Sequence, residues 1–354
     1  MELKANPIGK YITPINEKNK ENKYSNVLGV AIEKEFIPSV ANLIDTDLSK
    51  YSVLRKGRFA FNPMHVGRDM KLPIAMYKKV EPALVSPAYS MFEVNSDEIL
   101  PEYLELILKS SEFDHLCWFH TDASVRGGLS WDDFADLKIA VPSIQEQEKI
   151  VHNYKVVVDR IELLKNINYA IEKTCLIIYK KLILNNEPNS KLSDLIVINP
   201  KSKIQVNNAD PNGIFPFFTS GENIFKDSNV LVEGLNLFVN TGGKFDVKFY
   251  EGKASYSTDT LSITSKNDLT YYLYLFLKDN YSQIDETCFH GSALQHLQKD
   301  EFLKLNIYIP NTEEIDKYIC KINKLMKLVI QNKKEIVSLI NLKTTLLSTL
   351  TKEV

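Results

Sequence analysis

The chain has 354 residues, of which 44% are apolar, and a formal net charge of −2. This composition argues against global disorder, allows two domains or more, and shows no basic excess of the kind that marks general nucleic-acid binding. Four scattered cysteines without a C-x-x-C pair, no apolar signal segment and no run near 18 apolar residues predict a cytoplasmic protein without a disulfide framework, zinc site or membrane span.

Residues 1–143 predict an α+β globule. Short β-rich segments flanked by Gly, Pro or Asn, such as GRFAFN (57–62) and LVSPAYSMFEV (84–94), are typical of strands. The segment PEYLELILKSSEF (101–113) has helical spacing. A last short strand ends at Pro142, where a Gln/Glu-rich helix start follows.

Residues 144–186 predict one long helix, because apolar residues recur at alternating steps of three and four without an internal Gly or Pro. The series is Ile150, Tyr154, Val157, Ile161, Leu164, Ile167, Ile171, Cys175, Ile178 and Leu182. Such a sustained seam favours a coiled coil over a helix that packs only on its own domain.

Residues 187–354 repeat this plan. FLKLNIYIPN (302–311) matches FADLKIAVPS (134–143) without a gap, and LTYYLYLFL (269–277) matches LPEYLELIL (100–108). Three further blocks match in the same order, so an internal repeat is expected. Residues 187–311 would form a second α+β globule, and residues 312–354 a second long helix. We expect the two helices to pair as an antiparallel coiled coil between two similar globules.

The sequence carries few patterns that indicate catalysis or metal binding. The sequence has no dinucleotide or phosphate-loop motif, no H-E-x-x-H and no trustworthy ligand spacing among its six histidines. FNPM (61–64) lacks the second Pro and the aromatic residue that an amino-methyltransferase would stack on a flipped base. Asp246, Glu251 and Lys253 loosely resemble the set of a metal-dependent nuclease, although a solvated hairpin explains them as well.

Two loops carry a more informative pattern. TDASVRGGLSWDDF (121–134) and TCFHGSALQHLQKDEF (287–302) both place Gly, small polar residues and a basic or His side chain before a short helix. Backbone N–H groups and hydroxyls at such a position suit phosphate oxygens, and they equally suit an ordinary helix cap.

The whole arrangement resembles the specificity subunit of type I restriction-modification enzymes. The resemblance covers essentially the whole chain and is carried above all by DLKIAVPSIQEQEKIV (136–151) and its degenerate twin KLNIYIPNTEEIDKYI (304–319), and also by FPFFTSGE (215–222), GLNLFVNTGG (234–243) and GSALQHLQKDEF (291–302). We call each of these two strand-to-helix junctions, 136–151 and 304–319, a joint. Ile315 stands where the first joint has Gln147, so the second joint departs from the pattern.

The resemblance implies that residues 1–143 and 187–311 are target-recognition domains, each reading one half of a bipartite sequence in double-stranded DNA. The helices 144–186 and 312–354 would set the half-site spacing and dock two methyltransferase subunits. S-adenosylmethionine, ATP and Mg²⁺ would then belong to partner subunits, among them restriction and motor subunits. This chain would be non-catalytic and would hold no metal or cofactor.

The expected DNA contacts are polar side chains in the loops between the expected elements, because Arg and Lys favour guanine and Asn and Gln favour adenine. They are Asn62, His65, Arg68, Lys71, Ser124 and Arg126 in the first globule, and Thr219, Ser220, Asn240, Thr241, Lys244, His290, Ser292 and Gln295 in the second.

Other readings remain open at this point. They are the specificity subunit of a two-chain type II or methylation-only system, a Mg²⁺-dependent nuclease, and a coiled-coil interaction protein.

Overall fold

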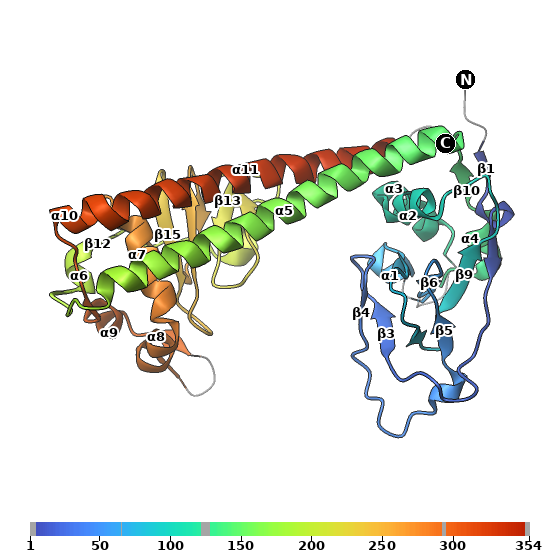
Figure 1. The fold of residues 1–354 in the computed structure, drawn as a ribbon, viewed down its shortest axis with the longest axis horizontal. Helices are drawn as coiled ribbons and strands as arrows, with labels where there is room; N and C mark the ends of the chain where they lie inside the picture. Colours follow the sequence, from blue (N-terminus) through green and yellow to red (C-terminus); the bar gives the residue numbers. More distant parts are fainter. Residues whose placement is uncertain (1–4, 65, 122–127, 292–294, 351–354) are drawn as a thin grey trace. The chain divides into compact units, whose positions relative to one another are not determined.

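The computed structural model describes residues 5–64, 66–121, 128–291 and 295–350. The chain divides into two compact units, unit 1 formed by residues 1–161 with 337–354 and unit 2 formed by residues 162–336. Both units mix helices and strands, which confirms the expected α+β class (Figure 1).

Unit 1 is built around a four-stranded antiparallel sheet in the order β2-β9-β6-β7. A second sheet has the order β4-β3-β8-β5, with β3 and β8 parallel. The elements of unit 1 are β1 (Ala5–Pro7), β2 (Ile12–Pro14), β3 (Val27–Val30), β4 (Phe36–Pro38), β5 (Ser52–Leu54), β6 (Phe59–Phe61), α1 (Val66–Asp69), β7 (Ile74–Met76), β8 (Ala83–Val85), β9 (Ser90–Val94), α2 (Pro101–Lys109), α3 (Ser111–Phe119), α4 (Trp131–Asp136), β10 (Lys138–Ala140) and the start of α5 (Ile144–Ile183).

The core of unit 1 is aromatic. The rings of Phe59 and Phe92 stack at 4.9 Å between centroids, and the ring of Phe134 lies 4.6 Å from that of Phe61. Phe134 comes from the short helix α4, so this helix is held against β6 by ring contacts. The first strand, β1, pairs antiparallel with β10, the last strand before α5.

Unit 2 contains a sheet of the order β12-β18-β15-β16, again antiparallel throughout, and a three-stranded sheet β14-β13-β17 in which β13 and β17 are parallel. Its elements are β11 (Ser190–Lys191), α6 (Leu192–Leu195), β12 (Ile196–Ile198), β13 (Phe215–Phe218), β14 (Phe225–Asp227), β15 (Leu235–Asn240), β16 (Val247–Glu251), β17 (Ser255–Tyr256), β18 (Thr260–Ser265), α7 (Thr270–Asp279), α8 (Tyr281–Cys288), β19 (Phe289–His290), β20 (His296–Leu297), α9 (Lys299–Leu303), β21 (Asn306–Ile307), α10 (Thr312–Glu314) and α11 (Cys320–Thr349). As in unit 1, the first strand, β11, pairs with the last, β21.

The second long helix is not continuous. A helical turn of the wider π type, Ile315–Ile319, separates α10 from α11, whereas the sequence predicts an unbroken helix from residue 312. Such a turn accommodates one extra residue per turn. It brings Ile319 to 1% exposure in the core of unit 2 and leaves Cys320, the next residue, exposed.

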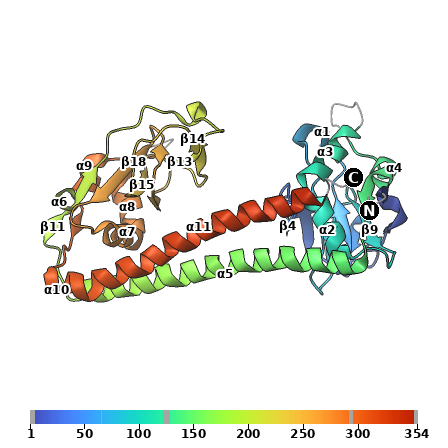
Figure 2. The same ribbon diagram turned by 90° about the horizontal axis from the view of Figure 1, so that it is seen from above.

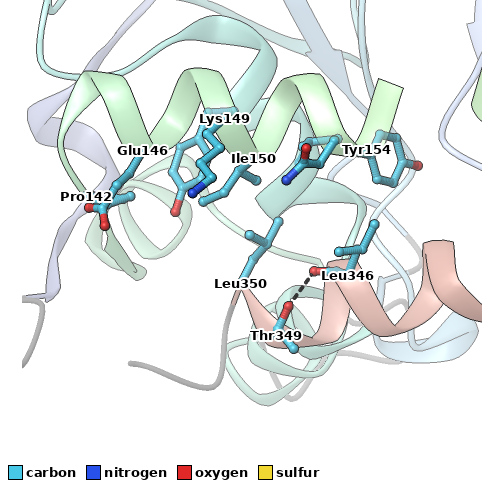
Figure 3. A pocket seen from close by; sticks show the side chains of 11 residues that line it. Pro142, Glu146, Lys149, Ile150, Tyr154, Leu346, Thr349 and Leu350 are labelled. Carbon is cyan, nitrogen blue, oxygen red and sulfur yellow. Dashed lines mark hydrogen bonds between the residues drawn. The ribbon is translucent and has the colours of Figure 1, made fainter. Parts of the chain in front are cut away.

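The two long helices contact each other in each unit. In unit 2, Asn332 Nδ2 of α11 donates a 2.8 Å hydrogen bond to Asn168 Oδ1 of α5, which runs alongside (Figures 1 and 2). In unit 1, Ile150 of α5 and Leu350, the residue that follows α11, line one cavity of about 370 Å³ (Figure 3). Among the helices within the described ranges, none is apolar over enough length to cross a membrane.

Acid should weaken unit 1 through Glu17, which accepts hydrogen bonds from Arg55 (Nη2, 2.5 Å) and Arg58 (Nη1, 2.6 Å). The bond from Arg55, followed by that from Arg58, lowers the pKa of Glu17 from 4.5 to about 2, against the opposing effect of burial. Its stabilising contribution is therefore present above pH 4.5 and is lost as the pH falls towards 2.

Glu17→Gln should remove this part of the acid dependence in urea denaturation between pH 6 and 2.5. Partial exposure limits the difference at pH 6 to about 1 kcal/mol. Equal pH slopes for the two proteins would contradict the assignment.

Candidate nucleic-acid interface

Three loops of unit 2 meet beyond the ends of its strands. They are the loop after β13 (219–223), the loop after β15 (241–246) and the paired strands β19 and β20 with the adjoining residue Gln295. Thr241 N donates to Ser220 Oγ at 3.3 Å, which joins the first loop to the second. Gly243 N donates to Gln295 O and Leu297 N to Thr241 O, both at 3.0 Å, which joins the second to the third. Polar side chains from distant segments are thereby gathered on one surface.

Several predicted contacts lie on these loops with different exposure. Lys244, His290 and Gln295 are exposed, Ser220 and Thr241 are half-buried, and Thr219 and Asn240 are buried. The exposed side chains are available to a ligand as they stand. The half-buried Ser220 already donates its hydroxyl to Asp259 O, so it holds the loops as well.

Asn240 shapes the second loop from inside. Its side-chain amide donates to Gly242 O at 3.1 Å and to Lys244 O, and its Oδ1 accepts from Asp246 N at 2.5 Å. Gly243 has φ +78°, a conformation that favours glycine. The side-chain bonds of Asn240 and this backbone conformation together present Lys244 to solvent.

A network of charges supports the same loop. Asp246 Oδ1 lies 3.0 Å from Lys278 Nζ, and Lys248 Nζ donates to Gly221 O at 2.6 Å. Burial alone would raise the pKa of Asp246, but the hydrogen bond and charge of Lys278, with the charge of Lys248, hold it below its usual value. Asp246 is therefore an ionised structural anchor at neutral pH.

This geometry does not favour the nuclease reading. Asp246 precedes β16 and Glu251 ends it, so the backbone positions of these two residues are about 16 Å apart along the strand. A shared metal ion needs its ligands within a few ångströms. Within the described ranges, no group of three or more His, Cys, Asp or Glu side chains is arranged to hold a metal ion.

Two residues of this surface, His296 and Lys248, are not among the predicted DNA contacts. His296 lies directly opposite His290 in the hairpin and beside Gly242. The alternation of the hairpin could have indicated it, because residues opposite one another share a face. Lys248 could not have been found locally, since its partners lie 27 and 29 positions away in the first loop.

Unit 1 places its three described predicted contacts, Asn62, Arg68 and Lys71, in the segment that follows β6. Asn62 Oδ1 accepts from Met64 N at 3.0 Å and so turns the chain there. Leu129 N donates to Pro63 O at 3.0 Å, which joins this turn to the loop before α4. Arg68 is exposed and paired with its neighbour Asp69, and this hydrogen bond raises the pKa of the guanidinium.

Lys71 is also exposed, just beyond α1. Four further predicted contacts lie outside the described residues: His65, Ser124, Arg126 and Ser292.

The fold is that of a known class of protein. It is similar to the crystal structure of the S subunit of a type I restriction-modification system from M. genitalium, with a TM-score of 0.58 over 98% of this chain and 96% of that one. At 15% sequence identity, this likeness shows a shared fold.

Family membership comes from the sequence. Residues 74–173 and 186–341 match the family described as the type I restriction modification DNA specificity domain. These segments cover well over half of the chain, which therefore belongs to this family. The resemblance that the repeated joints indicated is confirmed.

Two curated relatives agree with this assignment. The specificity subunit of the type I restriction enzyme HindI of Haemophilus influenzae (strain ATCC 51907 / DSM 11121 / KW20 / Rd) is 24% identical over 176 residues, 47% of this chain and 38% of that protein. The EcoDI specificity subunit of Escherichia coli is 27% identical over 124 residues, 35% of this chain and 28% of that protein. The matched segments thus span less than half of either relative.

Proposed function

We propose that this chain is a non-catalytic DNA-specificity subunit in which two target-recognition domains, residues 1–143 and 187–311, each read one half of a bipartite target. The observation that supports this most is the equivalent placement of polar loops in the two units. In each, the loop after the third strand of the sheet order, β6 or β15, is bonded through its backbone to the loop before a short helix, α4 or α9.

An internal repeat is the simplest account of this correspondence. The antiparallel sheets β2-β9-β6-β7 of unit 1 and β12-β18-β15-β16 of unit 2 have equivalent strand orders and directions, and each unit pairs its first strand with the last strand before its long helix. Gly57 and Gly234, which precede β6 and β15, have φ values of +88° and +86°. Agreement in topology and in a left-handed glycine at the equivalent place favours two copies of one domain over coincidence.

The long helices would set the distance between the two readers. In this proposal residues 144–186 and 312–354 form an antiparallel coiled coil, for which the Asn168–Asn332 bond is a suitable register-fixing contact. Half-site spacing then follows from the geometry of the protein, as it does in dimeric DNA readers. The same helices would dock two methyltransferase subunits.

Those partners would carry S-adenosylmethionine, and associated restriction and motor subunits would use ATP and Mg²⁺. The loop surfaces would bind double-stranded DNA through the predicted contact residues, with lysines positioning phosphates and polar side chains reading bases.

The test is co-expression with a cognate methyltransferase subunit, followed by long-read sequencing of methylated bases in the host. A single motif of two short blocks separated by a fixed unspecified spacer is expected. Exchanging residues 1–143 for those of a relative should change one block, and exchanging residues 187–311 should change only the other. A stable complex that methylates no bipartite motif would overturn the proposal.

A methylated motif without cleavage of unmodified DNA, with any restriction subunit supplied, would instead identify a methylation-only system. Absence of any complex and of duplex binding would favour an interaction protein.

A further inference from the structure

The tip of the β3–β4 hairpin in unit 1 carries an unusual lysine. Lys34 N donates to Ala31 O, and Ala31 N to Glu35 O, each at 2.9 Å, so the turn is tight. Lys34 has φ +64°, a left-handed backbone conformation that residues other than Gly, Asn and Asp rarely adopt. A lysine in a position that suits glycine indicates that its side chain is needed elsewhere.

That side chain enters the junction between α2 and α3. Lys34 Nζ lies 2.7 Å from Asp114 Oδ1 and donates to Leu108 O at 2.5 Å, and the two side chains are only 6% and 8% exposed. Leu108 belongs to the last turn of α2, and Asp114 to the first turn of α3. Both helix ends favour the charge they meet, a cation at the C-terminus and an anion at the N-terminus.

The same carboxylate oxygen also holds the backbone of a third segment. Leu72 N donates to Asp114 Oδ1 at 2.9 Å, and Leu72 is fully buried. Just before Leu72 the chain leaves α1 through Met70, which has φ +52°, and presents Lys71 to solvent. Asp114 therefore fixes one end of the segment 68–71, in which Arg68, Met70 and Lys71 are exposed.

We propose that Asp114, with Lys34 as its charge partner, is a positioning residue for DNA reading by unit 1. It acts by anchoring Leu72 N, and so sets the positions of Arg68 and Lys71, two of the predicted DNA contacts of unit 1. This inference rests on the proposed function of the chain.

Two double variants separate the anchor from the ion pair. Lys34→Met with Asp114→Asn removes both charges and keeps an acceptor for Leu72 N. Lys34→Met with Asp114→Leu has nearly the same shape and removes the acceptor as well. Removing both charges together avoids leaving one buried charge without its partner.

The readout is affinity of the variant complex for the cognate duplex and for duplexes altered in one block. The Asn pair should stay within about threefold of the wild type, and the Leu pair should lose about tenfold on the cognate duplex, the loss expected for one misplaced polar contact. Discrimination should fall only in the block read by unit 1. The block read by unit 2 serves as an internal control, because a general loss of stability would affect both.

A Leu pair that reads both blocks like the wild type would overturn the inference, as would an equal loss in both blocks. If the Leu pair does not fold, Asp114→Glu replaces it, since it keeps the ion pair but moves the acceptor by one methylene. Loss confined to the unit 1 block would again support the anchor, and unchanged reading would overturn it. Failure of the proposed function is distinguishable, because the wild-type complex itself would then methylate no bipartite motif.

Discussion

Phe134→Ala is expected to lower the free energy of unfolding of unit 1 by about 4 kcal/mol, the cost typical of removing a buried phenylalanine. Phe134 is fully buried, and its ring lies 4.6 Å from that of Phe61 and 5.5 Å from that of Phe92. Its loss would leave a cavity between the sheet and α4, just where the chain enters β10 and α5. Urea denaturation followed by residue-resolved amide exchange measures the effect.

The matched control is Phe302→Ala, because Phe302 is the fully buried residue that aligns with Phe134 and belongs to α9 of unit 2. Each change should reduce amide protection mainly in its own unit. A loss below about 1 kcal/mol, or equal loss of protection in both units from Phe134→Ala, would contradict this description of the core.

Gln147→Leu should destabilise unit 1 by about 3 kcal/mol. The side chain of Gln147 is completely buried at the start of α5, where its Oε1 accepts from Leu100 N and its Nε2 donates to Glu98 O and Pro142 O, each at 2.8 Å. Leucine has a similar volume but satisfies none of these backbone groups, and each buried group left unpaired costs about 1–3 kcal/mol.

Gln145→Leu is the control for this change, since Gln145 lies in the same turn and is exposed. It should alter stability by less than about 0.5 kcal/mol. Thermal unfolding of the two variants measures the difference. Similar melting temperatures for both would contradict a stabilising role for the hydrogen bonds of Gln147.

The second joint solves the same problem with a different residue. Where the first copy has Gln147, the second has Ile315, and Glu314, one position earlier, makes the side-chain hydrogen bonds instead. Glu314 accepts from Tyr308 Oη at 2.6 Å, from Asn186 Nδ2 at 2.9 Å and from Asn311 N at 3.0 Å. The hydrogen bond from Tyr308 is the main cause of the lowered pKa of Glu314. This substitution explains why the second joint is less easily recognised in the sequence.

Helices that follow from the spacing of apolar residues along the chain could be predicted from the sequence. The apolar spacing from Ile150 to Leu182 predicts a helix, and α5 runs from Ile144 to Ile183. The π-type turn at Ile315–Ile319 was missed because the same spacing of apolar residues is compatible with a continuous helix.

Side-chain roles that depend on distant partners could not be predicted. Asn240 was chosen for its capacity to read adenine, yet its amide is engaged with the carbonyls of its own loop. No local pattern distinguishes Lys34 from other lysines, and its partner Asp114 lies 80 positions further along the chain. Spacing within a window carries no information about such contacts, which arise only when the sheet and helices have packed.

The division of the chain also sets an order of events during synthesis. Residues 1–161 leave the ribosome first, but the residues that complete unit 1, from 337 onwards, follow only after the whole of unit 2. Until then Ile150 and Tyr154, which line one cavity with Leu346 of α11 and with Leu350 (Figure 3), lack these C-terminal neighbours. A nascent chain therefore carries an uncovered apolar surface for the time needed to translate unit 2, and chaperone demand should be greatest in that interval.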